Sequence, residues 1–176
     1  MDEKRIAWAI TGAGHFLEEC IETILNHDRV DIFLSRAAEE VVRLYRFDAR
    51  IAVPKIRIYE ETKPSSPLVV RFFAGHYAVL VIAPATSNSV AKFVYGISDS
   101  EVTNVFAQAG KSRVPVIVFP TDLAPEMDSV GPRGERFKVY PRPVDLENTE
   151  KLRSFPGVTV VGSREELERG ISAYVK

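Results

Sequence analysis

Three short stretches of this sequence place glycines or small polar side chains directly after predicted strands. They are residues 11–15 (TGAGH), Ser35 with Arg36, and residues 84–88 (PATSN). The two glycines of the first stretch let backbone N–H groups approach an anion at the start of a helix. Because the carboxyl ends of parallel strands share one edge of a sheet, we expect the three stretches to form one binding crevice. The candidate binding residues are Gly12, Ala13, Gly14, His15, Ser35, Arg36, Pro84, Ala85, Thr86, Ser87 and Asn88.

The details of the first two stretches favour a mononucleotide over NAD. A dinucleotide fingerprint would need a third glycine at position 17, where this chain has Leu17. The second predicted strand ends in Ser35 and Arg36 instead of the acidic residue that binds the ribose diol of NAD. A hydroxyl beside a guanidinium suits a phosphate monoester.

Each stretch also has a purely structural interpretation. A glycine pair after a strand often serves a tight turn, Ser35 can cap a helix while Arg36 stays solvated, and residues 86–88 can cap the next helix. His15 either contacts a phosphate or substrate or is simply exposed. Trp8 and Tyr45 are expected in the core. The convergence of three polar strand ends is what favours a binding site.

The hydrophobic pattern predicts alternating strands and helices. We expect strands at residues 4–11, 30–34, 56–59, 79–83, 114–119 and 158–161, and a less regular one at 137–140. We expect helices at residues 16–26, 36–45, 87–97, 99–110, 145–153 and 163–174, and a short one from Ser66 and Pro67 through Phe73.

Several boundaries depend on single residues. Pro84 is expected to end the central strand, Asp99 to cap the helix that follows, and Gly110 to stop that helix. Ser163 and Glu166 predict a capping box, with Tyr174 on the inner face of the last helix. Residues 120–136 are predicted to form a long irregular loop, of the kind that serves as a functional lid.

This alternation indicates a single α/β domain over residues 1–176, with a three-layer αβα, Rossmann- or flavodoxin-like parallel sheet covered by helices on both faces. The 23 basic and 24 acidic side chains give a net charge of -1, which argues against nucleic-acid or membrane partners. Cys20 is the one cysteine, so no internal disulfide forms, and no apolar run is long enough for a spanning segment. We expect a cytoplasmic protein.

The stretch APATSNSVAKFVYGISDSEVTN resembles the segment of the flavin-containing cysteine decarboxylase superfamily that carries a Pro-Ala-Ser-Ala-Asn-Thr motif. In this chain the motif is Pro84, Ala85, Thr86, Ser87, Asn88 and Ser89. The stretches TGAGHFLEE and YPRPVDLENTEKL are most similar to the archaeal flavoprotein and dihydromethanopterin reductase branch. The resemblance runs from about Ile6 to Val161.

The resemblance implies a bound FMN. Gly12, Ala13, Gly14 and Ser35 would hold its phosphate, and residues 85–88 would hold the ribitol and the edges of the isoalloxazine ring. It also implies a homo-oligomer, a trimer or dodecamer of trimers, with FMN near a subunit interface. Residues near Asp99 and Ser100, or the long loop, would then complete a neighbour's site.

The chain departs from the decarboxylase pattern at two places. The histidine that these enzymes carry before the central strand would fall near Val70, and His76 is too close to the strand to match. Their Pro-x-Met-Asn-x-x-Met-Trp motif is replaced by FPTDLAPEM, which keeps only Pro120 and an isolated Met127. A phosphopantothenoylcysteine-type or peptidyl-cysteine decarboxylase is therefore the second hypothesis and not the first.

Because the acid/base histidine and the substrate-binding motif of the decarboxylases are missing, the leading hypothesis is that the protein uses the flavin for redox chemistry. It would act in electron transfer or as a reductase, with a pterin among the candidate substrates. Arg36 and Lys92 are candidates to stabilise anionic reduced flavin. No cysteine cluster could hold an iron–sulfur centre, so a ferredoxin or other redox partner would be a separate protein. No catalytic residue and no metal ligand are assigned. The residues also leave open a non-catalytic subunit that holds a nucleotide, and an NADP-binding module.

Overall fold

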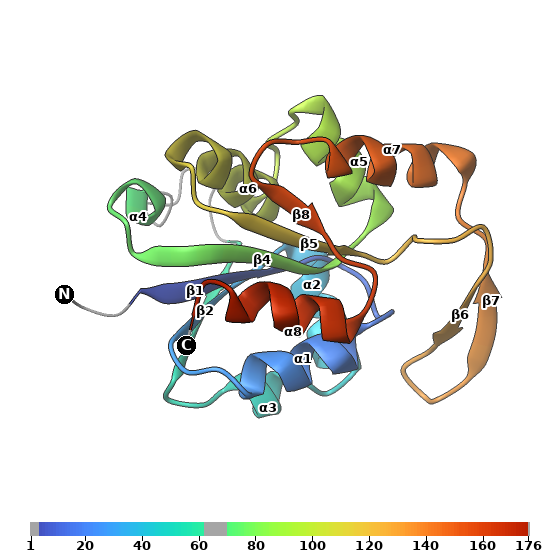
Figure 1. Ribbon diagram of the computed structural model, residues 1–176. Helices are drawn as coiled ribbons and strands as arrows, with labels where there is room; N and C mark the ends of the chain where they lie inside the picture. The colour runs from blue at the N-terminus through green and yellow to red at the C-terminus, as the bar shows by residue number, and fades with distance from the viewer. Residues whose placement is uncertain (1–3, 62–69, 176) are drawn as a thin grey trace.

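The computed structural model describes residues 4–61 and 70–175, and its centre is a six-stranded sheet in which every pairing is parallel (Figure 1). In spatial order the strands are β3 (Ile56–Glu60), β2 (Val30–Leu34), β1 (Arg5–Ile10), β4 (Tyr77–Ala85), β5 (Val116–Pro120) and β8 (Val158–Val160). The chain order reverses between β1 and β4. In open α/β sheets, ligands bind beyond the carboxyl ends of the strands at this reversal.

Helices cover both faces of the sheet, which confirms the predicted three-layer arrangement. One face packs against α1 (Leu17–Leu25), α2 (Arg36–Leu44), α3 (Asp48–Ile51) and α8 (Arg164–Ser172). The other packs against α4 (Val70–Phe73), α5 (Ser87–Tyr95), α6 (Glu101–Ser112) and α7 (Pro143–Arg153). Trp8 is fully buried, and its indole nitrogen donates to the Ala83 carbonyl at 2.7 Å. Within the described ranges no helix is both long and apolar enough to cross a membrane.

The stretch predicted as an irregular lid contains half of a β-hairpin. Strand β6 (Met127–Val130) pairs antiparallel with β7 (Arg136–Val139), in a two-stranded sheet separate from the main one. The turn that joins the two strands includes Gly134, at φ 84°. Figure 1 shows this hairpin projecting at the end of the molecule toward which the parallel strands run. The four-residue β6, in which Asp128 and Ser129 separate Met127 from Val130, lacks the apolar run by which the other strands were found, so sequence reasoning missed it.

The central strand does not stop at Pro84. It runs to Ala85, which pairs with Pro120 after a shift in register, and the Ala85 carbonyl accepts the Thr121 N–H at 2.9 Å. Pro84 sits inside the strand, after a cis peptide bond, and contributes its carbonyl to hydrogen bonding. The missing N–H of a proline therefore does not end this strand.

Three other predicted boundaries were wrong. Helix α5 ends at Tyr95 because Gly96 takes a left-handed conformation, so Ile97 lies outside it. Helix α6 runs past Gly110 to Ser112, and the residue that caps it, Arg113, takes a left-handed conformation. Helix α7 begins two residues earlier than expected, with Pro143 in its first turn. The predicted start of the short helix at Ser66 and Pro67 lies outside the described residues.

The last helix corrects two further expectations. The Ser163 hydroxyl accepts the Glu166 N–H at 3.2 Å, but the Glu166 carboxylate accepts the N–H of Gly162 rather than that of Ser163. The cap is therefore only half of the predicted box. Leu167 and Ile171 are buried as expected, whereas Tyr174 is exposed.

The N-cap of α6 is Ser100 and not Asp99. The Ser100 hydroxyl accepts the Thr103 N–H at 3.3 Å, and the Thr103 hydroxyl accepts the Ser100 N–H at 2.9 Å. The Asp99 carboxylate turns outward and pairs with Lys92 at 2.8 Å, which keeps the pKa of Asp99 below its usual value.

Replacing the cap should therefore cost more than replacing its neighbour. We expect Ser100→Ala to lower the free energy of unfolding by about 1 kcal/mol, measured by urea denaturation, because a capping hydroxyl is lost. Asp99→Ala is the matched control and should cost less, because its ion pair is exposed. A larger loss for Asp99→Ala would mean that the cap has been assigned to the wrong residue.

Candidate functional site

The first and third predicted stretches are joined by one buried hydroxyl. Thr11, at the end of β1, donates its hydroxyl hydrogen to the Pro84 carbonyl at 2.9 Å, and the same oxygen accepts the Thr86 N–H at 2.8 Å. The Thr11 N–H also donates to the Pro84 carbonyl, at 3.2 Å. Thr11 is 2 % exposed. These bonds hold the ends of two neighbouring parallel strands, and the loops that follow them, in one fixed relation.

A pocket of about 340 Å³, which we call the inner pocket, opens where these two loops meet. It brings together most of the predicted binding residues. Those that line it are Gly12, Ala13, Gly14, His15, Thr86, Ser87 and Asn88. Thr86 caps α5 by accepting the Ser89 N–H at 3.3 Å, so the pocket lies at the positive end of that helix.

The other four predicted residues do not line this pocket. Ser35 is nearby, since its N–H donates to the Ile10 carbonyl at 3.2 Å, but its hydroxyl is occupied in capping α2 by accepting the Ala38 N–H at 3.1 Å. Arg36 has an exposed side chain, and its N–H donates to Glu61 at 3.1 Å. Pro84 and Ala85 contribute backbone carbonyls that hold the strand ends. A phosphate contact by Ser35 or Arg36 stays a prediction.

The two glycines of the first loop are required by close packing. A Cβ atom on Gly12 would lie 2.5 Å from the Cβ of Ala37. A Cβ atom on Gly14 would lie at clashing distance from the Tyr45 ring and its hydroxyl. The structural and functional interpretations of this loop therefore both apply, because the same small residues that permit the packing also leave the backbone accessible to the pocket.

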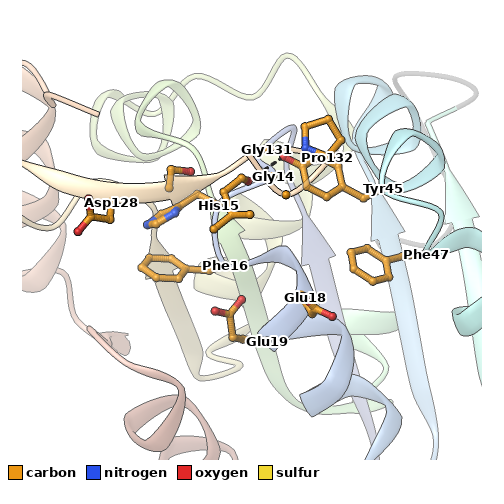
Figure 2. A pocket seen from close by; sticks show the side chains of 13 residues that line it. Gly14, His15, Phe16, Glu18, Glu19, Tyr45, Phe47, Asp128, Gly131 and Pro132 are labelled. Atoms are coloured by element: carbon orange, nitrogen blue, oxygen red, sulfur yellow. Dashed lines mark hydrogen bonds between the residues drawn. The ribbon is translucent and has the colours of Figure 1, made fainter. Parts of the chain in front are cut away.

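Tyr45 packs against the core, as expected, and also lines the pocket. It is half-buried over Gly14, and its hydroxyl donates to the Val130 carbonyl of the hairpin at 3.3 Å (Figure 2). Burial raises the pKa of Tyr45, with a further contribution from the Glu135 carboxylate, so Tyr45 stays a neutral phenol. Tyr45 thus connects the end of α2, the glycine loop and the hairpin.

His15 is half-buried in the same wall, and its Nε2 atom is buried without a hydrogen-bond partner among the described residues. Its ring centroid lies 3.7 Å from that of Phe16, which stacks on Phe119 at 4.5 Å. Burial lowers the pKa of His15, although Glu19 and Asp122 oppose this shift, so the imidazole is neutral at neutral pH. A neutral imidazole with a buried, unsatisfied nitrogen is suited to a hydrogen bond with a ligand.

Sequence reasoning missed half of the lining. Thr121 and Asp122 follow β5, and their place after a strand is a signal that could have found them. Four residues come from the hairpin, which was not predicted as a whole: Met127, Ser129, Phe137 and Val139. Lys92, by contrast, is held in its ion pair with Asp99 and does not line the pocket. Across residues 4–61 and 70–175, no group of acidic, histidine or cysteine side chains could hold a metal ion.

A glycine loop and a capped helix at the reversal of a parallel sheet define an α/β nucleotide-binding protein. The family model described as "Flavoprotein" matches residues 1–174, so this chain belongs to the Flavoprotein family. An uncharacterized protein of Methanocaldococcus jannaschii is 36% identical in an alignment that covers 98% of this chain and 96% of that protein. The predicted resemblance to FMN flavoproteins is confirmed.

Two further relatives have more specific names. Dihydromethanopterin reductase (acceptor) of Methanosarcina mazei is 43% identical in an alignment that covers 70% of this chain but only 57% of the reductase. A crystal structure of Burkholderia xenovorans DmrB in complex with FMN, described as a cubic protein cage for redox transfer, has a TM-score of 0.88 and 39% identity. The alignment covers 98% of this chain and 95% of DmrB.

Proposed function

We propose that this chain is an FMN-dependent reductase that takes a pterin as substrate. The main observation behind this proposal is the inner pocket. It brings together the glycine loop, the Thr86–Asn88 loop and the His15 imidazole at the point where the strand order reverses. Membership of the Flavoprotein family and similarity to DmrB, which was crystallised with FMN, support FMN as the cofactor. The similarity to dihydromethanopterin reductases supports the pterin, although this chain spans only 57% of the Methanosarcina enzyme.

The residues present fit FMN. Gly14 packs under the Tyr45 ring without a side chain and so leaves its backbone accessible at the pocket. Thr86 and Ser87 add hydroxyl groups at the positive end of α5. The backbone of residues 12–15 would hold the phosphate, and residues 86–88 would bind the ribitol and the ring edge. The unsatisfied Nε2 of His15 supplies a hydrogen bond at the same wall. When bound, FMN provides one- and two-electron transfer, and these residues position it.

We further propose a homo-oligomer in which a separate protein or small molecule supplies electrons. DmrB, which is 39% identical to this chain, is described as a cubic protein cage. Exposed apolar side chains near the pocket are available for such contacts, among them Phe137, Tyr140 and Val144. The oligomeric states to test are a trimer and a dodecamer of trimers. The electron donor to test is a ferredoxin.

Purification tests the cofactor directly. We expect the purified protein to be yellow, to release FMN on denaturation in about one equivalent per chain, and to bleach on reduction with dithionite. The reduced protein should then be reoxidised by a dihydropterin. A colourless protein that fails to take up added FMN would overturn the proposal. A flavin that is reduced but never reoxidised by a dihydropterin would leave FMN binding intact and reject the substrate.

A further inference from the structure

A second pocket lies beside the inner pocket, between the hairpin and the start of α1. This outer pocket has a volume of about 500 Å³, and it shares Gly14, His15, Tyr45 and Ser129 with the inner pocket. The two spaces therefore meet at one wall, in which His15 and Tyr45 are the large side chains. A ligand in the outer pocket would lie next to whatever occupies the inner one.

The outer pocket offers aromatic surfaces on several sides. Phe16, Tyr45 and Phe47 contribute rings, and Tyr45 and Phe47 stack at 6.3 Å between centroids. Pro132 in the hairpin turn adds an apolar surface, and Figure 2 shows it beside Tyr45, with Phe47 on the same side of the pocket. Flat rings are the ligands that such surfaces favour, since stacking adds to the burial of apolar area.

The charged groups of the outer pocket are acidic. Glu18, Glu19 and Asp128 line it, and none of the described lining residues is a lysine or arginine. Lys138 pairs with Asp128 at 3.4 Å, and Glu22, one turn along α1 from Glu18, pairs with Arg164. The ion pairs of the described residues do not include Glu18 or Glu19, so these two carboxylates are available to a ligand.

We propose that the outer pocket is a second ligand site that takes a flat heteroaromatic ring with adjacent N–H donors, and that Glu18 and Glu19 determine its specificity. Adjacent N–H groups match the two oxygens of a carboxylate. The 2-amino-4-oxo edge of a pterin has this pattern. A dinucleotide with several phosphates meets like charge and is repelled. The inference rests on the proposed function, because it assigns the place where the second reactant of an FMN reductase binds.

Binding of 6-methylpterin to the FMN-loaded protein tests this assignment, with quenching of pterin fluorescence as the measurement. The double variant Glu18→Gln/Glu19→Gln should raise the dissociation constant of the pterin at least fivefold and leave the FMN content unchanged. Glu40→Gln, an exposed position on α2, makes the same kind of charge change away from the pocket and should stay within twofold of wild type. NADP⁺ should bind wild type more weakly than the pterin does.

Each failure has a distinct meaning. If wild type carries no FMN, the proposed function fails before the pocket is tested. If FMN is bound but pterin affinity is the same in wild type and the double variant, the assignment of Glu18 and Glu19 is overturned. It is also overturned if the double variant loses FMN, because the outer pocket would then be part of the flavin site, or if NADP⁺ binds more tightly than the pterin.

Discussion

Replacing Asp31 with alanine should lower the free energy of unfolding by about 3–5 kcal/mol, because it breaks a buried charge network. The Asp31 side chain is 0% exposed and lies 2.6 Å from Arg5 and 3.3 Å from Arg71. It also accepts the Tyr77 hydroxyl at 2.9 Å, and burial raises the pKa of Tyr77, with the Asp31 charge as the second cause. Tyr77 therefore remains a protonated donor, and the loss of Asp31 leaves it and two cations without their shared acceptor.

Urea denaturation followed by circular dichroism measures this loss. Asp31→Asn keeps the shape and one acceptor but removes the charge, so it should fall between wild type and Asp31→Ala. Glu150→Ala removes an exposed carboxylate that pairs with Arg153 at 3.0 Å, and it should cost under about 1 kcal/mol. Equal, small losses for all three variants would mean that the network around Asp31 contributes little to the fold.

The parts of the fold that depend on strong, local patterns were predictable. The mostly apolar sequences of β1, β2, β4 and β5 mark strands buried on both faces, and their alternation with amphipathic helices implies a parallel sheet. Single-residue signals were less reliable. Asp99 and Ser100 are both competent caps. The helix uses Ser100, which forms a capping box with Thr103, while Asp99 pairs with Lys92.

The candidate site was predictable where it depends on strand ends and not where it depends on distant contacts. Gly14 and Asn88 were expected together and do line one pocket, because β1 and β4 are neighbours in the sheet. Tyr45 lies at the end of an amphipathic helix, and periodicity could not show that its ring reaches Gly14 and the hairpin. The residues that β6 contributes to the pocket could not be predicted either. This four-residue strand is defined by its pairing with β7, which the local sequence of β6 does not reveal.

Thr11→Val is the substitution that should most directly separate the two loops of the inner pocket. Valine has nearly the same shape as threonine but lacks the hydroxyl, so the Thr86 N–H loses its acceptor, while the Pro84 carbonyl keeps only the N–H of residue 11. An unsatisfied donor of this kind costs about 1–3 kcal/mol. We expect that loss in the free energy of unfolding and, because residues 12–15 and 86–88 are no longer held in register, a rise of about tenfold in the dissociation constant of FMN.

Thr11→Ser is the matched variant, because it restores the hydroxyl and removes only a methyl group. It should recover most of the FMN affinity, measured by titration of the apoprotein with FMN and quenching of flavin fluorescence, even if the lost methyl group lowers stability somewhat. If valine and serine weaken FMN binding equally, the hydroxyl is not what connects the loops, and packing of the methyl group carries the effect. If neither changes FMN affinity, the flavin does not depend on the relation between these two strand ends, and the inner pocket is not its site.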